Sequence, residues 1–228
     1  MAKQVKVKKK IKILPVIITL LVLVVLAVVS LILIKQPIKN IYIKNNNYLT
    51  DQEIIDQAGI DNYPSFILTS KNKIKKKLKK NSLIKNVKIQ KKIWGRINIK
   101  VEEYNILFRQ YNNDDLIVLE NKEEVEDQEY RYLVPKLLNY VPDTKYDEFI
   151  KAMNKIDENI KVQISEITYV PNEQDKDRFL LYMNDGNYVY LTITKFKQIN
   201  YYEDVLKTLN GKKGILYLDS GNHFKIME

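Results

Sequence analysis

The sequence predicts an α+β protein with a single N-terminal transmembrane helix, followed by a β-α-α-β-β module and a mixed β domain with two helices. An uncharged apolar run fills residues 13–34. Beyond it, the apolar pattern first gives the order strand, helix, helix, strand, strand, and later short strands alternating with amphipathic helices. We expect a basic tail at 1–12, the transmembrane helix at 13–34, the first domain at 37–104 and the β domain at 105–228.

Composition and charge exclude several classes of functional site. The chain has no cysteine, which excludes disulfides, thiol nucleophiles and Cys-based metal sites. Its one histidine, His223, excludes His-rich metal clusters. Residues 1–12 carry six Lys and no acid, residues 35–104 have a net charge of +10, and residues 105–228 have a net charge of −6. Three regions of different character therefore follow one another along the chain.

The apolar run is long enough to cross a membrane. As a helix it spans ~33 Å at about 1.5 Å per residue, against a hydrocarbon core of roughly 30 Å. A cleaved signal peptide is the alternative, but its apolar stretch is about 7–15 residues and ends at small residues. The only candidate cleavage site here, Val28-Val29-Ser30, lies near the far end of the run. We therefore expect a retained anchor with a cytoplasmic N-terminus and residues 35–228 outside, because basic flanks stay inside.

The first module begins with a short strand and a capped helix. The strand has apolar residues at Ile38, Ile41 and Ile43, and Asn45–Asn47 predict the turn that follows it, because Asn tolerates the left-handed conformation. Thr50 and Glu53 have the spacing of a capping box. Gly59 predicts the end of this helix.

A second helix and two strands complete the module. The helix is expected over residues 70–81, with Ser70 as its cap and two apolar residues on its buried face. Residues 83–91 and 96–103 alternate apolar and polar side chains and predict two strands. No catalytic residue type is concentrated here, which suits a docking module.

The second domain is predicted to contain two hairpins. The first has its turn at 112–115 and the second at 184–187, where Asp185-Gly186 suits a type I′ turn. The strands that flank these turns are 106–111 with 116–120, and 179–183 with 188–193.

Two helices and a last strand are expected in the same domain. Thr144 can cap a helix whose buried face would hold Tyr146, Phe149, Ile150, Met153 and Ile156. A second helix is expected near 195–210, ending at Gly211, and residues 214–219 predict the last strand.

The element order of the first module resembles a POTRA domain, and directly after one anchor it resembles the DivIB/FtsQ family of bacterial division proteins. The residues at the positions of the family pattern are Ile41, Ile43, Asn45, Asn46, Leu49, Thr50, Glu53, Ile54, Ile99, Val101 and either Glu103 or its neighbour Glu102. Asn45 stands where the family has Gly, and Trp94-Gly95 replaces its usual Pro-Asn. Four later segments are similar, in order, to the family's β domain: VPKLL (134–138), ISEI (164–167), LYMNDGNYV (181–189) and GILYLDSGNHF (214–224).

The resemblance implies a non-catalytic membrane-anchored scaffold that helps assemble the division machinery and septal wall synthesis. The partners it implies are small bitopic division proteins of the DivIC (FtsB) and FtsL type. The alternatives are a membrane-anchored extracytoplasmic enzyme acting on the cell wall and a POTRA-type module in polypeptide export.

Two considerations predict a partner-binding site near the C-terminus. A last strand at 214–219 would lie at a sheet edge, which a partner segment can extend. Asp219-Ser220-Gly221 also resembles the family's Asp-Ser-Gly at its partner-binding strand. The expected binding residues are Tyr217, Leu218, Asp219, Ser220, Gly221 and Phe224. Tyr217 and Leu218 should point to opposite faces of the sheet; a purely structural strand is the alternative.

No catalytic, cofactor-binding or metal-binding residues are expected. Asp219, Ser220 and His223 are the residue types of a hydrolase triad, but neighbours in one turn point in different directions. The acidic segment 120–129 holds six carboxylates but lacks the Gly and the alternating ligands of a calcium loop, so we expect a solvated loop.

A strongly basic run fills residues 70–100, with 13 basic residues and no acid. It is either a solvated lysine face or a surface for anionic lipid headgroups or cell-wall polymer. The expected topology and the lack of an aromatic stacking platform argue against nucleic acid as a partner. The candidate binding residues are Lys75, Lys76, Lys79 and Lys80.

Overall fold

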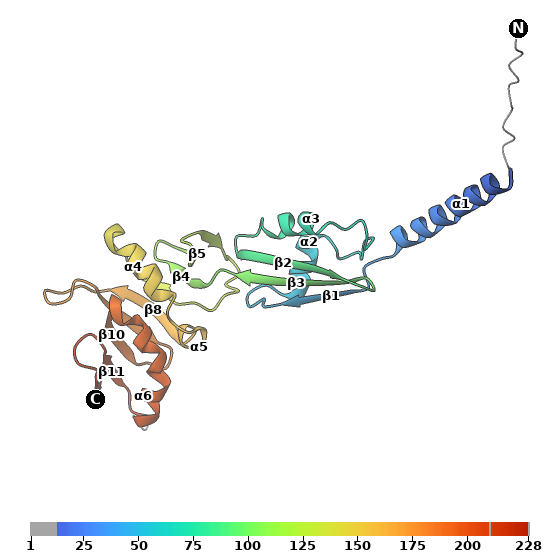
Figure 1. Ribbon diagram of the computed structural model, residues 1–228. Helices are drawn as coiled ribbons and strands as arrows, with labels where there is room; N and C mark the ends of the chain where they lie inside the picture. Colours follow the sequence, from blue (N-terminus) through green and yellow to red (C-terminus); the bar gives the residue numbers. More distant parts are fainter. Residues whose placement is uncertain (1–12, 210, 228) are drawn as a thin grey trace, which may run out of the picture. The chain divides into compact units, whose positions relative to one another are not determined.

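The computed structural model describes residues 13–209 and 211–227 (Figure 1). The predicted basic tail, residues 1–12, lies outside this part of the chain. The chain divides into two compact units, Met1–Lys80 with Asn86–Val101 and Asn81–Lys85 with Glu102–Glu228. Helix α1 (Ile13–Lys35) buries none of its side chains and is long and apolar enough to cross a membrane. The predicted span, 13–34, is thus reproduced to within one residue.

The first unit contains the predicted order of strand, helix, helix, strand, strand. Its elements are β1 (Asn40–Lys44), α2 (Asp51–Ala58), α3 (Lys71–Leu78), β2 (Ile84–Lys92) and β3 (Arg96–Glu103). Strand β3 lies between β1 and β2 and runs parallel to β1. Its alternating Ile97, Ile99 and Val101 are buried, as the alternation predicts.

The local signals around α2 are confirmed. Thr50 accepts a hydrogen bond from the Glu53 amide, and the Glu53 carboxylate accepts one from the Thr50 amide at 2.8 Å. Gly59, at φ 64°, ends the helix in the left-handed conformation, and Asn45 turns the chain at φ 63°. These features depend only on residues within four positions of one another, which is why the pattern predicts them well.

Helix α3 differs from its prediction at both ends. The Ser70 side chain makes no capping hydrogen bond, and the helix ends at Leu78 rather than at Asn81. The Asn81 side chain accepts a hydrogen bond from the Leu83 amide at 2.9 Å. Such a side-chain turn competes with helix continuation and directs the chain into β2.

The second unit is built on a nine-stranded sheet with the order β12-β11-β10-β9-β8-β7-β4-β5-β6. The strands are β4 (Ile106–Gln110), β5 (Asn113–Leu119), β6 (Glu124–Glu126), β7 (Lys136–Leu137), β8 (Ile164–Tyr169), β9 (Arg178–Met183), β10 (Tyr188–Thr192), β11 (Gly214–Tyr217) and β12 (His223–Ile226). The helices are α4 (Asp143–Met153), α5 (Glu158–Lys161), the 3-10 helix η1 (Ile193–Tyr201) and α6 (Tyr202–Thr208).

An aromatic cluster joins the helices of the second unit to its sheet. Phe149 of α4 stacks on Phe179 of β9 with ring centroids 4.9 Å apart. Phe196 of η1 meets both rings edge-on, at 5.9 and 5.3 Å. All three side chains are fully buried, so this cluster is the centre of the hydrophobic core.

Several turns and caps of the second unit differ from the predictions. The first hairpin turns at Tyr111-Asn112, between β4 and β5, and not over 112–115. In the second hairpin only Gly186 has a positive φ, 87°, so the turn is not type I′, which needs two such residues. Thr144 lies inside α4, whose N-cap is Pro142, and the predicted helix near 195–210 begins as η1 at Ile193.

A candidate interaction edge

The predicted edge strand is internal. Strand β11 pairs in parallel with β10 on one side and antiparallel with β12 on the other. The turn between β11 and β12 contains two residues in the left-handed conformation, Gly221 at φ 97° and Asn222 at φ 52°, and they send the chain back along β11. Within the part of the chain that the structure describes, β12 is the strand at this end of the sheet.

The backbone of β12 presents hydrogen-bonding groups away from the sheet. The Met227 amide donates to the Lys213 carbonyl at 3.0 Å, which makes this a hydrogen-bonded antiparallel pair. Hydrogen-bonded pairs alternate along an antiparallel ladder, so Lys225 and His223 also face β11. The amides and carbonyls of Phe224 and Ile226 therefore point outward, where a further strand would pair.

The opposite edge of the sheet is protected by charge. Strand β6 has the sequence Glu124-Val125-Glu126, and the Asp127 amide donates to the Asp115 carbonyl at 2.7 Å. By the same alternation, the outward backbone groups of β6 belong to Glu124 and Glu126. Charged edge residues disfavour strand addition, so β12 is the better template for a partner.

A row of aromatic and charged side chains crosses four strands on the sheet face opposite the core. The Arg178 guanidinium lies 3.7 Å from the Tyr190 ring centroid, Tyr190 stacks on Tyr217 at 5.5 Å, and Tyr217 stacks on His223 at 4.8 Å. Asp219 accepts a hydrogen bond from Arg178 Nε at 2.7 Å. The turn after β11 is thereby fixed to β9 by an ion pair.

Some of the predicted partner-binding residues lie in the core and others on the surface. Tyr217 and Leu218 do face opposite sides, but Leu218 is only 7% exposed and belongs to the core. Phe224 is partly buried against the same core and is not a free aromatic anchor. Ser220 and Gly221 are exposed in the turn. Sequence reasoning missed Ile226, an exposed apolar residue of β12, because the strand was not predicted.

A buried polar network positions the start of β11. Asn187 accepts a hydrogen bond from the Gly214 amide at 2.8 Å, and its side-chain amide donates to the Tyr202 hydroxyl at 2.9 Å. The Tyr202 hydroxyl donates to the Asp185 carboxylate. Burial raises the pKa of the Tyr202 phenol, so it remains a protonated donor. The network ties β11 to α6 and to the β9–β10 turn.

The side chains of the suspected triad do not form a relay. The Ser220 hydroxyl donates to Asp219 at 3.1 Å, Asp219 pairs with Arg178, and the His223 ring stacks on Tyr217. A relay needs a histidine that hydrogen-bonds the serine and is oriented by the aspartate. Among residues 13–209 and 211–227, no group of three or more His, Asp or Glu side chains is placed to share a metal ion.

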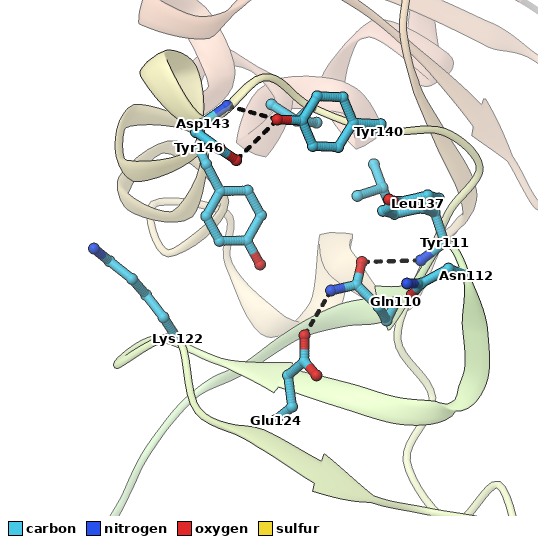
Figure 2. Close-up of a pocket in the computed structure, with 10 residues that line it drawn as sticks. Gln110, Tyr111, Asn112, Lys122, Glu124, Leu137, Tyr140, Asp143 and Tyr146 are labelled. Carbon is cyan, nitrogen blue, oxygen red and sulfur yellow. Dashed lines mark hydrogen bonds between the residues drawn. The ribbon is translucent and has the colours of Figure 1, made fainter.

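A small cavity lies between α4 and the β4–β5 hairpin (Figure 2). Its volume is about 260 Å³, below the ~300–1,000 Å³ typical of small-molecule sites. Tyr140 donates to Asp143 at 2.9 Å and Gln110 donates to Glu124 at 2.7 Å, so these polar side chains satisfy one another. The geometry does not resemble a catalytic site.

The acidic segment 120–129 is not simply a solvated loop. It contains β6, and Asp127 is buried against the guanidinium of Arg109 on β4. Arg109 also donates to the Asp114 and Tyr132 carbonyls and lies 4.2 Å from the Tyr130 ring centroid. No local pattern in the sequence predicts this pair, because the two residues are 18 positions apart.

The four lysines of the predicted anionic surface are exposed. Lys75 and Lys76 are on α3, and Lys79 and Lys80 follow it. Their neighbour Lys77 places its ammonium group beside Gly59, at the C-terminus of α2, where the helix dipole favours a cation.

Two protein-family models match two consecutive parts of the chain. Residues 36–104 match the family model "POTRA domain, FtsQ-type", and residues 106–220 match "Cell division protein FtsQ/DivIB, C-terminal". The chain is 32% identical over 197 residues to the cell division protein DivIB of Bacillus subtilis (strain 168), covering 82% of this chain and 73% of that protein. It is 30% identical over 196 residues to DivIB of Bacillus cytotoxicus, covering 84% and 77%.

A solved structure, the major extracytoplasmic domain of the trans isomer of DivIB from Geobacillus stearothermophilus, aligns with a TM-score of 0.39 and 23% identity. The alignment covers 48% of this chain and 96% of that one. The two family models match consecutive parts of the chain, and the curated relatives cover more than four-fifths of it. This chain therefore belongs to the FtsQ/DivIB family of cell division proteins.

Proposed function

We propose that this protein is a non-catalytic scaffold of bacterial cell division, which binds other division proteins and supports septum formation and septal wall synthesis. The observation that carries the proposal is the β12 edge, with outward backbone groups at Phe224 and Ile226, in a chain of the FtsQ/DivIB family. An exposed strand edge can bind an extended segment of a protein partner through backbone hydrogen bonds, and it does not form a pocket for a small substrate.

The proposed topology has the N-terminus in the cytoplasm and residues 35–228 outside, at the division septum. Six lysines precede α1, and basic flanks remain on the cytoplasmic side. A reporter enzyme that is active only outside the cytoplasm should work when it is fused after residue 228. Activity only of a cytoplasmic reporter at that position would overturn this topology.

The proposed partners are DivIC (FtsB)-like and FtsL-like bitopic proteins. An extended segment of such a partner would add to β12 as a tenth strand of the sheet, paired with the outward groups of Phe224 and Ile226. Its side chains would contact Ile226 on one face, and His223 and Tyr217 on the other. The Arg178–Asp219 pair and the Asn187 network hold this edge in place before the partner arrives.

Proline substitution on the edge tests this mode of binding. Ile226→Pro removes an outward amide and leaves the amides of Lys225 and Met227 free to bond β11. Because one lost hydrogen bond and the added bulk each weaken strand pairing, about tenfold weaker binding to the DivIC-like partner is expected.

Glu126→Pro is the matched control, since it removes an outward amide from β6 at the other edge. It should bind the partner like the wild type. Circular dichroism of each purified variant checks the fold. A folded Ile226→Pro protein that pulls down the partner as efficiently as the wild type would show that the site lies elsewhere.

The absence of catalysis is also part of the proposal. It is supported by the different contacts of two residues: Ser220 hydrogen-bonds Asp219, whereas His223 stacks on Tyr217. A variant with Ser220→Ala and His223→Ala should have no hydrolytic activity to lose. Turnover of a wall or peptide substrate by the purified protein, abolished in that variant, would favour a membrane-anchored wall enzyme.

A further inference from the structure

Four large apolar side chains are exposed in two loops of the first unit. Trp94 is 80% exposed and Ile93 78% in the β2–β3 turn, while Leu68 is 68% exposed and Ile67 49% in the loop before α3. We call these four residues the apolar rim. Exposed apolar residues are ordinary when they are scattered, but a group of them marks a surface that meets an apolar partner.

Both loops are hydrogen-bonded to the chain just after the membrane-spanning helix. Ser65 Oγ donates to the carbonyl of Ile34, in the last turn of α1, at 2.5 Å, and the Phe66 amide donates to the Gln36 carbonyl at 2.8 Å. From the other loop, the Gly95 carbonyl accepts from the Lys39 amide at 2.8 Å. Each loop of the rim is therefore fastened to a residue that lies within four positions of the end of α1.

Lys91 joins the two loops to each other. Its ammonium group donates to the carbonyls of Ile67 and Thr69, at 3.3 and 3.0 Å, and lies 4.5 Å from the centroid of the Phe66 ring. The rim is thus one surface with a fixed internal arrangement. Lys91 satisfies backbone groups that would otherwise oppose burial of the Ile67–Thr69 segment in an apolar environment.

The β2–β3 turn holds Trp94 outward. Trp94 and Gly95 have φ values of 65° and 74°, the left-handed region that a bulky residue adopts at an energetic cost. A side chain at position 95 would lie 3.2 Å from the Pro37 carbonyl, so the turn packs tightly against the chain that leaves α1. The turn therefore holds Trp94, the largest aromatic side chain of the unit, outside the protein core and beside the end of the anchor.

We propose that the apolar rim inserts into the headgroup and acyl-chain interface of the membrane that α1 spans, and so holds the first unit against the bilayer. The apolar run of α1 ends at Ile34, the residue whose carbonyl Ser65 contacts. The interface layer extends roughly 5–8 Å beyond the hydrocarbon on each side, so loops fastened to Ile34 and Gln36 lie at its depth. Tryptophan favours this layer, because its ring is apolar and its N–H reaches water or lipid carbonyls.

The positive charges next to the apolar rim also suit a membrane surface. Lys35, Lys39 and Lys92 flank the two loops, and no acidic residue occurs between Gln36 and Lys44 or between Pro64 and Lys100. Lysines at this depth extend toward lipid phosphates while their stems cover apolar surface. The bilayer is the partner that the anchor itself brings to the rim, without a second binding event.

Trp94 makes the proposal directly measurable, because it is the only tryptophan of the chain. The full-length protein is reconstituted into phospholipid vesicles, and its tryptophan emission is recorded with acrylamide in the water or with lipids brominated near the headgroup end of the acyl chain. We expect a blue-shifted emission maximum, strong quenching by the brominated lipid and weak quenching by acrylamide. Red-shifted emission that acrylamide quenches and brominated lipid does not would overturn the proposal.

Paired variants separate rim insertion from mere proximity to the bilayer. Leu68→Ser with Ile93→Ser leaves Trp94 in place but removes two of its apolar companions, so quenching by brominated lipid should fall and emission should shift to the red. Leu133→Ser is the matched control: Leu133 is also 78% exposed but belongs to the second unit, and its loss should change neither signal. If the double variant is quenched like the wild type, the rim does not hold the unit to the membrane.

Discussion

Replacing Asp127 by alanine is expected to lower the free energy of unfolding of the second unit by about 3–5 kcal/mol. The Asp127 carboxylate is 1% exposed and pairs with the guanidinium of Arg109, which is 7% exposed. It also accepts hydrogen bonds from the amides of Arg131, at 2.9 Å, and Tyr132, at 3.3 Å. One side chain therefore satisfies a buried cation and two backbone donors.

The magnitude follows from what alanine leaves behind. Arg109 keeps the carbonyls of Asp114 and Tyr132 as acceptors, at 3.0 and 3.1 Å, but loses its counter-charge. Removing one partner of a buried ion pair costs about 3–5 kcal/mol, and each unsatisfied amide adds about 1–3 kcal/mol where water cannot reach it. The cost of the unpaired charge and the cost of the unsatisfied amides do not simply add, because water can enter the space that the carboxylate leaves. The expected loss is therefore the range for the broken ion pair alone, about 3–5 kcal/mol. Asp127→Asn also removes the counter-charge but keeps an acceptor oxygen for Arg109, so it should cost less than Asp127→Ala.

Urea unfolding, followed by circular dichroism on protein lacking α1, measures the effect. In the double variant with Arg109→Met no charge is left buried, so it should be less destabilised than the two single losses together. Lys207→Ala is the control, since Lys207 forms an exposed ion pair with Asp204 at 2.7 Å, and no measurable change is expected. A loss below about 1 kcal/mol for Asp127→Ala, or strict additivity in the cycle, would refute the buried-pair argument.

Three further predictions concern other parts of the chain. Burial raises the pKa of Tyr202 above its ordinary value of 10.0, so its stabilising effect is complete below pH 10 and is lost as pH rises beyond it, because the unfolded chain ionises first. Tyr202→Phe should reduce the slope of stability against pH above 10 in alkaline melts; an unchanged slope contradicts this. Gly214→Ala places a Cβ 2.1 Å from the Lys225 carbonyl, so it should break β11–β12 pairing and abolish partner capture, and wild-type capture would disprove that. Neutral substitutions at Lys75, Lys76, Lys79 and Lys80 should weaken binding of the protein to anionic vesicles or wall polymer. The difference from the wild type should be smaller at high salt, because salt screens these charges. Equal binding by variant and wild type at low salt would indicate a solvated lysine face.

The parts of the fold that could be predicted are those whose causes are local. The capping box of Thr50 and Glu53 acts over three residues, and the alternation of Ile97, Ile99 and Val101 shows which face of β3 is buried. The limits of α1 were predictable because an uncharged apolar run of this length is typical of one continuous helix long enough to cross a bilayer.

The parts that could not be predicted depend on contacts between distant residues. Strand β12 alternates polar and apolar residues over only four positions, which is too short a signal to predict a strand without its pairing with β11. The Arg178–Asp219 pair joins positions 41 apart, and Arg109–Asp127 turns a segment that looks like a solvated acidic loop into a buried clamp. The predicted edge strand, β11, is consequently internal, and the edge belongs to β12, which was not predicted.

Amide hydrogen exchange at β12 tests the central claim most directly. In the free protein the outward amides of Phe224 and Ile226 should exchange quickly, while those of Lys225 and Met227, which face β11, should exchange slowly. Saturation with the DivIC-like partner should slow exchange at Phe224 and Ile226 because a new strand pairs with them. Unchanged exchange at both amides in the saturated complex, or new protection at Glu124 and Glu126 of β6 in their place, would contradict binding at the β12 edge.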